Sequence, residues 1–167
     1  MIGTREDTAG VDVAEAEGTS AVSFPLFAAA GLSIAADLLY LWLAPGAFGY
    51  WWAYAAFLLV AGTAQGLFAV ALMRRPAQPL VLLGIAGNLF LAGFYLVTRA
   101  AGMPFGPGAW VGLSVGTPDI IAVAAQFGVV LALVPLLGRA LRGMVVSALL
   151  GLGGLLWVLE LARLLSV

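Results

Sequence analysis

Long apolar stretches separated by short connections rich in Gly, Pro and Arg dominate the pattern of the chain. Each stretch is close to the ~20 residues that a helix needs to cross a bilayer. They cover residues 24–43, 52–73, 79–98, 119–137 and 143–161. Because backbone polar groups in lipid must be hydrogen-bonded within their own segment, α-helices are the form that fits. The pattern predicts an all-α polytopic transmembrane helical bundle of about five spans within a transmembrane domain over residues 23–167.

The first 22 residues differ from everything that follows. They are polar and acidic, and they are rich in Gly, Thr and Ala. A segment of this composition buries too little apolar surface to offset the entropy of ordering its backbone. We therefore predict a disordered acidic cytoplasmic tail over residues 1–22.

Composition supports a membrane environment. Of 167 residues, 63% are hydrophobic and 9% are charged, and the mean hydropathy is +1.12, whereas soluble domains carry about 25% charged residues. Membrane lipids are therefore the first expected partner. The net charge is −1, and the few arginines are dispersed. Nucleic acid is not an expected partner, because phosphate binding needs a concentrated basic patch.

The chain contains no Cys, His or Lys. Without Cys there are no disulfides, thiolate nucleophiles or iron–sulfur ligands. Without His the commonest metal and haem ligand is missing, and without Lys no Schiff base forms. We predict that no metal or cofactor binds through this chain's own ligands, while contacts with lipid or pigment stay open.

The arginines also predict an orientation. Basic residues favour the cytoplasmic side of a membrane, and five of the seven fall on one side if the N-terminus is inside: Arg5, Arg74, Arg75, Arg139 and Arg142. We predict an N-terminus in, C-terminus out topology. The short inner connections predict that the second and third spans, and likewise the fourth and fifth, are antiparallel neighbours. Residues 44–51 and 100–118 are expected to be outer loops, with aromatic residues at the headgroup level.

Four polar side chains lie inside predicted spans, where they are costly and become candidate sites: Asp37, Gln65, Asn88 and Gln126. Counting along the helices places them in two tiers. Asp37 and Gln126 lie about 10 Å below the outer surface, and Gln65 and Asn88 about 12 to 14 Å above the inner one. Each tier is able to close its own interhelical hydrogen bond, worth about 0.6 kcal/mol. The functional alternative is a ligand or proton path.

Small residues predict close helix packing at two places. Gly62 and Gly66 form a GxxxG motif, and Ser147 with Gly151 forms a second pair of small residues at the same spacing. Such pairs serve packing within the chain as well as packing against a partner. Arg99 and Asp119, at the outer ends of adjacent spans, are predicted to form an ion pair that anchors the interface.

Several segments carry a resemblance: LYLWLAPGAFGYWWAYAAFLLVAGTAQ, RRP, GIAGN, TRAAGMPFGP and GTPDIIAVAAQ. Together they resemble a family of small, uncharacterised multi-span membrane proteins of actinobacteria and Chloroflexi-like bacteria. The resemblance implies that histidines and glutamates cluster near the outer helix ends in that family. The matching positions here are Tyr40, Ala47, Tyr50 and Gln126. The scaffold is kept and the candidate ligands are absent.

These observations favour a non-enzymatic accessory or structural subunit of a larger respiratory or photosynthetic complex in the bacterial cytoplasmic (inner) membrane. Other membrane-protein subunits are the expected partners. The alternative is a small-solute or proton-coupled carrier or channel that uses the intramembrane polar residues. A membrane enzyme acting through Asp37 or Glu160 ranks last, because the residues for it are few.

Overall fold

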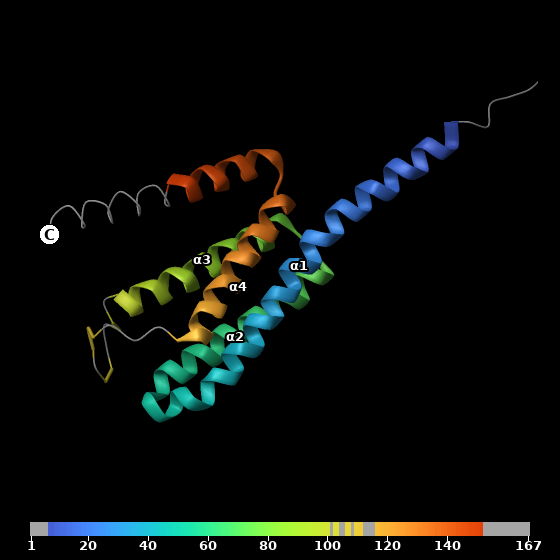
Figure 1. Cartoon of the computed structure of the whole chain (residues 1–167). Helices are drawn as coiled ribbons and strands as arrows, with labels where there is room; N and C mark the ends of the chain where they lie inside the picture. Colours follow the sequence, from blue (N-terminus) through green and yellow to red (C-terminus); the bar gives the residue numbers. More distant parts are fainter. Residues whose placement is uncertain (1–6, 101, 104–105, 108, 112–115, 152–167) are drawn as a thin grey trace, which may run out of the picture. The chain divides into compact units, whose positions relative to one another are not determined.

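The computed structural model describes residues 7–100, 102–103, 106–107, 109–111 and 116–151. Its helices are α1 (Asp7–Tyr50), α2 (Trp52–Arg74), α3 (Gln78–Ala100) and α4 (Thr117–Leu133), followed by the 3-10 turn η1 (Val134–Leu136) (Figure 1). Residues 139–151 are also helical. The part of the chain that the structure describes contains no strand, and the all-α prediction is confirmed.

Within the described residues, four helical segments are long and apolar enough to cross a membrane: Phe24–Tyr50, Trp52–Arg74, Gln78–Arg99 and Thr117–Leu136. They coincide with the first four predicted spans. Many of their large apolar side chains are exposed on the outside of the bundle, as those of Trp42, Phe90 and Leu131 are, and in a bilayer that surface meets lipid. The predicted fifth span, 143–161, lies partly outside the described residues. The predicted orientation rests on the arginines alone and stays a prediction.

Helix α1 is longer at both ends than the sequence predicted. It begins at Asp7 and so includes residues expected in the disordered tail, where frequent Ala and Glu favour a helical backbone. At its other end α1 continues through Pro45 to Tyr50, so the predicted outer loop over residues 44–51 is wrong. Proline is tolerated in membrane helices when packing holds the turn, and Ala44 and Ala47 are both buried here. Trp51 alone joins α1 to α2.

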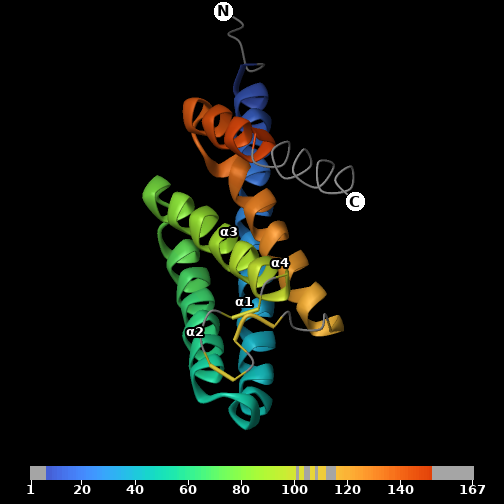
Figure 2. The same cartoon turned by 90° about the vertical axis from the view of Figure 1, so that its left-hand side faces the viewer.

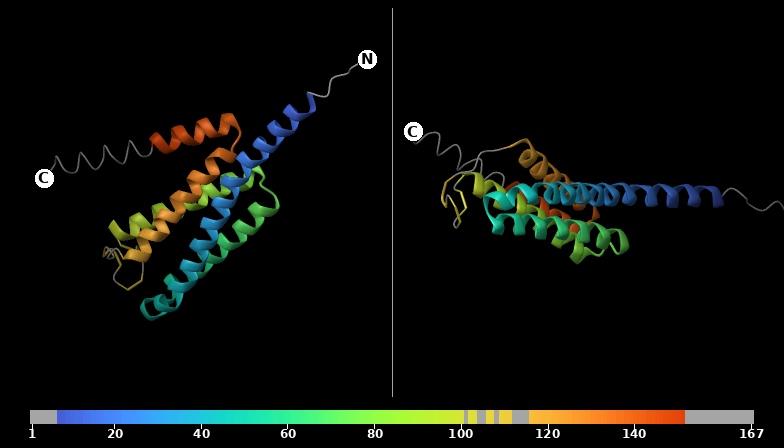
Figure 3. Two further views of the ribbon diagram at one scale, coloured as in Figure 1. Left: turned by 45° about the vertical axis from the view of Figure 1, so that its right-hand side comes forward. Right: turned by 90° about the horizontal axis from the view of Figure 1, so that it is seen from below.

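The packing of the four helices centres on α1. It contacts α2 and α4 along much of their lengths, and α3 packs on α4 (Figures 2 and 3). Small side chains allow this close approach, because most of the core between α1, α2 and α4 is alanine. Contacts between α2 and α3 are few, although their short connection predicted close neighbours. The Phe68 ring fills the space beside Gly84 and holds the two helices apart.

Two described residues of the connection between α3 and α4, Gly106 and Pro107, lie against the junction of α1 and α2. The Tyr50 hydroxyl donates a hydrogen bond to the Pro107 carbonyl at 2.8 Å, and Gly106 lies against the Trp51 ring. Gly102 has a φ of +80°, a region that glycine adopts without strain. A Cβ there would come within 2.5 Å of the Val111 backbone, so glycine is required at this turn.

Candidate functional site: a buried polar column along α1

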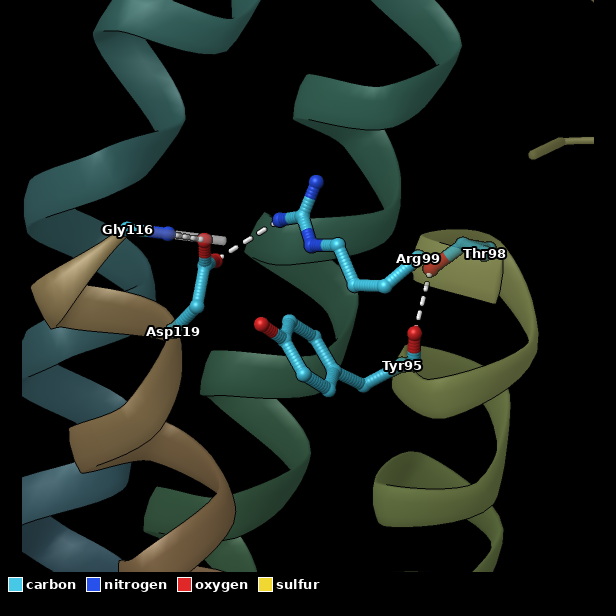
Figure 4. Close-up of polar contacts among 5 residues, drawn as sticks. All are labelled: Tyr95, Thr98, Arg99, Gly116 and Asp119. Carbon is cyan, nitrogen blue, oxygen red and sulfur yellow. Dashed lines mark hydrogen bonds and ion pairs between the residues drawn. The ribbon is translucent and has the colours of Figure 1, made fainter. Parts of the chain in front are cut away.

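The column begins at one end of the bundle with the ion pair between Arg99 and Asp119 (Figure 4). Arg99 Nη2 donates to Asp119 Oδ1 at 2.8 Å, and the Gly116 backbone N–H donates to Asp119 Oδ2 at 2.8 Å. The guanidinium also lies over the Tyr95 ring, 4.9 Å from its centre. Asp119 therefore caps the start of α4 and ties it to the end of α3. The predicted ion pair is confirmed.

Deeper in the bundle, Tyr40 of α1 and Gln126 of α4 form a hydrogen bond in which Gln126 Nε2 donates to the Tyr40 hydroxyl. Both side chains are buried, and Gln126 is 1% exposed. Among the described residues, Gln126 Oε1 has no hydrogen-bond partner. The predicted pairing of Gln126 with Asp37 is wrong, because the longer Tyr40 side chain, three residues further along α1, reaches Gln126 instead.

Asp37 points at α2 rather than at α4. Its carboxylate occupies the notch left by two glycines: a Cβ at Gly66 would lie 2.6 Å from Asp37 Oδ2, and one at Gly62 would lie 3.2 Å from Oδ1. Within the described part of the chain, Asp37 Oδ1 has no hydrogen-bond partner. One turn away on α1, the fully buried Ser33 hydroxyl lacks a partner as well. The GxxxG motif thus makes room for an acidic side chain.

A small chamber lies between the ion pair and the Tyr40–Gln126 pair. Its volume is about 30 Å³, and its walls include Tyr54, Tyr95 and Thr98 as well as Asp119 and Gln126. The buried Tyr95 hydroxyl has no described partner in hydrogen-bond geometry, although the Arg99 guanidinium lies close enough to interact with it. Beside the chamber is a wider vestibule of about 320 Å³, lined by residues that include Tyr50, Tyr54 and Arg99.

The hydrogen bonding of the tyrosines in this column is not predicted by the sequence pattern. Tyr54 and Tyr95 lie in apolar stretches and fit the hydrophobic pattern, and the family resemblance marks Tyr40 only as a position whose candidate ligand is absent. A buried tyrosine hydroxyl usually needs a hydrogen-bond partner. This requirement indicates that a buried tyrosine should be paired with a nearby polar side chain, as Tyr40 is with Gln126.

The second polar tier is separate from the column and links α2 to α3. Gln65 Nε2 donates to Asn88 Oδ1 at 2.8 Å, and Asn88 Nδ2 donates to the Gly84 carbonyl at 2.8 Å. Gln65 is 4% exposed and Asn88 is 2% exposed. The predicted hydrogen bond between these two residues is confirmed.

The remaining predicted sites stay predictions. Ser147 and Gly151 lie on the helical segment 139–151. Across the residues that the structure describes, no group of three His, Cys, Asp or Glu side chains is placed to hold a metal ion. The expectation about cofactors rests on the composition.

Four apolar spans around a mostly alanine core define this chain as an all-α polytopic membrane protein. No protein-family model, curated protein or solved structure matches it in the comparisons. The family resemblance drawn from its motifs stays a prediction.

Proposed function

We propose that this protein is a non-enzymatic accessory or structural subunit of a larger respiratory or photosynthetic complex in the bacterial inner membrane. The observation that supports this proposal is an apolar groove between α2 and α3, the two helices that are consecutive in the chain yet make few contacts. The groove has a volume of about 360 Å³.

The walls of the groove suit a helix. Ala61 and Ala64 of α2 and Gly87 of α3 are small residues in these walls, of the kind that lets membrane helices approach closely. A Cβ at Gly87 would meet nothing within 4 Å, so this wall is open. We infer that the occupant is a transmembrane helix of another subunit, whose apolar side chains fill the groove.

The floor of the groove strengthens the argument for an apolar occupant. Gln65 and Asn88 line it, but they hydrogen-bond to each other and to the Gly84 carbonyl. A polar ligand would have to compete with these bonds. A helix that brings only apolar side chains leaves them intact.

A pair of matched glycine substitutions tests the subunit role. Gly87→Leu fills the groove, whereas Gly93→Leu adds the same side chain on α3 at a position that is equally open and does not line the groove. The full-length protein is extracted mildly from its native membrane and measured by native mass spectrometry. We expect the wild type and Gly93→Leu to travel with the same partner subunit and Gly87→Leu to travel without it.

Three results contradict the subunit role. The wild type travels alone or with lipid only, it travels as a pair of identical copies, or Gly87→Leu keeps the partner as well as Gly93→Leu does. The secondary structure of each variant is checked by circular dichroism, so that loss of the partner is separated from loss of the fold.

A second candidate function is a small-solute or proton-coupled carrier or channel. The observation that favours it is the run of buried polar atoms without partners along α1, which includes Gln126 Oε1, Asp37 Oδ1 and the Ser33 hydroxyl. Polar groups inside a membrane span are functional candidates by default. A flux that depends on Asp37 separates this candidate from the subunit role.

A further inference from the structure

The small chamber beneath the Arg99–Asp119 ion pair meets the physical requirements of a buried water site. A polar cavity needs roughly 10 to 15 Å³ to hold a water molecule, and the water needs two to four polar partners. The chamber measures about 30 Å³. The residues that line it include Tyr40, Thr98 and Gln126, whose side chains carry the polar groups that a bound water needs as partners.

Two polar atoms of the chamber residues have no hydrogen-bond partner among the described residues: Gln126 Oε1 and the Tyr95 hydroxyl. Gln126 is 1% exposed. Buried polar atoms in folded proteins almost always have a partner, either protein or ordered water. Because Gln126 Oε1 accepts hydrogen bonds and the Tyr95 hydroxyl also donates them, water is able to satisfy both.

The chamber has a route to the end of the bundle. It adjoins the vestibule, with which it shares the wall residues Leu43, Tyr54, Leu58 and Asp119. The vestibule reaches Gly46 and Tyr50, which are exposed at the end of α1. In the other direction the hydrogen-bonded residues Tyr40 and Gln126 line the chamber, and Asp37 does not.

We propose that the chamber binds one or two water molecules, which bridge Gln126 Oε1 and the Tyr95 hydroxyl and exchange with the aqueous phase through the vestibule. Water then enters the membrane span from the Arg99 end and stops at the Tyr40–Gln126 pair. The Arg99–Asp119 ion pair stands beside this passage, since both residues line the vestibule and Asp119 also lines the chamber. The water site does not depend on the proposed subunit role.

The absence of cysteine from the natural sequence allows a direct test, because an introduced thiol is the only one present. Ala122→Cys places a thiol in the wall of the chamber. Ala92→Cys is the matched control, since Ala92 is similarly buried, at 3% against 5% for Ala122, and lines none of the three cavities. Gly46→Cys reports on the vestibule, where a Cβ meets nothing within 4 Å.

Two probes of different size are applied to the full-length protein in nanodiscs. The silver ion is close to water in size and reacts with the thiolate, a form that apolar burial suppresses. We expect silver to react with Ala122→Cys at least about tenfold faster than with Ala92→Cys. A bulky trimethylammonium methanethiosulfonate should modify Gly46→Cys and leave Ala122→Cys unmodified. Mass spectrometry after denaturing maleimide labelling counts the unreacted thiols.

Each outcome supports or overturns the water site. Equal silver rates at Ala122→Cys and Ala92→Cys in folded protein overturn it, and so does modification of Ala122→Cys by the bulky reagent as fast as Gly46→Cys. If circular dichroism shows that Ala122→Cys does not fold, Thr98→Cys replaces it, because Thr98 also lines the chamber. Adding Gln126→Leu should lower the silver rate toward that of Ala92→Cys, since it removes the unpartnered oxygen.

Discussion

The two polar regions inside the bundle differ in how completely their hydrogen bonds are satisfied. Gln65 and Asn88 form a closed unit, in which each amide donates one bond and the Gly84 carbonyl accepts the second. The column along α1 is open by contrast, since the hydrogen bond between Tyr40 and Gln126 leaves Gln126 Oε1 without a described partner. Buried polar groups that are satisfied within the chain stabilise a fold.

This difference separates a polar region that serves helix packing from one whose unpartnered polar atoms are available to bind water or a solute. The closed pair fixes α2 against α3 at the floor of the groove. The open column places unpartnered polar atoms around a water-sized chamber and in a glycine notch. Three substitutions, taken in order of decreasing expected effect, test this contrast.

Gly66→Ala should have the largest effect, because its Cβ would lie 2.6 Å from Asp37 Oδ2. Overpacking of this kind costs about 1 to 3 kcal/mol, which we expect as a lower free energy of unfolding in mixed detergent micelles. Gly93→Ala is the control, since its Cβ meets nothing within 4 Å, and it calibrates the gain in helix propensity from alanine. Asp37→Ala should restore stability to Gly66→Ala. Equal stabilities for Gly66→Ala and Gly93→Ala would show that the notch accommodates the added methyl group without strain.

Gln65→Leu should have an intermediate effect. It removes the donor to Asn88 Oδ1 and should lower the free energy of unfolding by about 0.6 kcal/mol, and by roughly 2 at most, the range for hydrogen bonds between membrane helices. The double variant Gln65→Leu/Asn88→Leu leaves no unsatisfied partner. Its loss should therefore be smaller than the sum of the two single losses in a double-mutant cycle. Strict additivity would mean that the bond between them contributes nothing.

Asp37→Asn should have the smallest effect on stability, about 0.6 kcal/mol or less. The substitution keeps the size of the side chain, and Asp37 Oδ1 has no described partner to lose. Unfolding in micelles and native mass spectrometry of the complex measure stability and assembly. Proton or solute flux into liposomes is measured in parallel. If Asp37→Asn assembles normally and stops a flux that the wild type supports, the carrier replaces the subunit as the function.

The sequence predicted the parts of this molecule that depend on local composition. Apolar length located four spans, and the position of Arg99 and Asp119 at adjacent helix ends predicted their ion pair. Depth along the helices paired Gln65 with Asn88 correctly. Depth alone did not predict the neighbour of Asp37. A helix that is hydrophobic on all sides gives no sign of which face packs against which neighbouring helix. For the same reason the pairing of Tyr40 with Gln126 was not predicted.

The single-residue link at Trp51 has a mechanical consequence. Only one residue connects α1 to α2. Because so short a connection does not let one helix slide along the other, these two helices are expected to move together. Between α2 and α3, by contrast, contacts are few, so the alignment of these two helices depends more on the Gln65–Asn88 hydrogen bond at the floor of the groove.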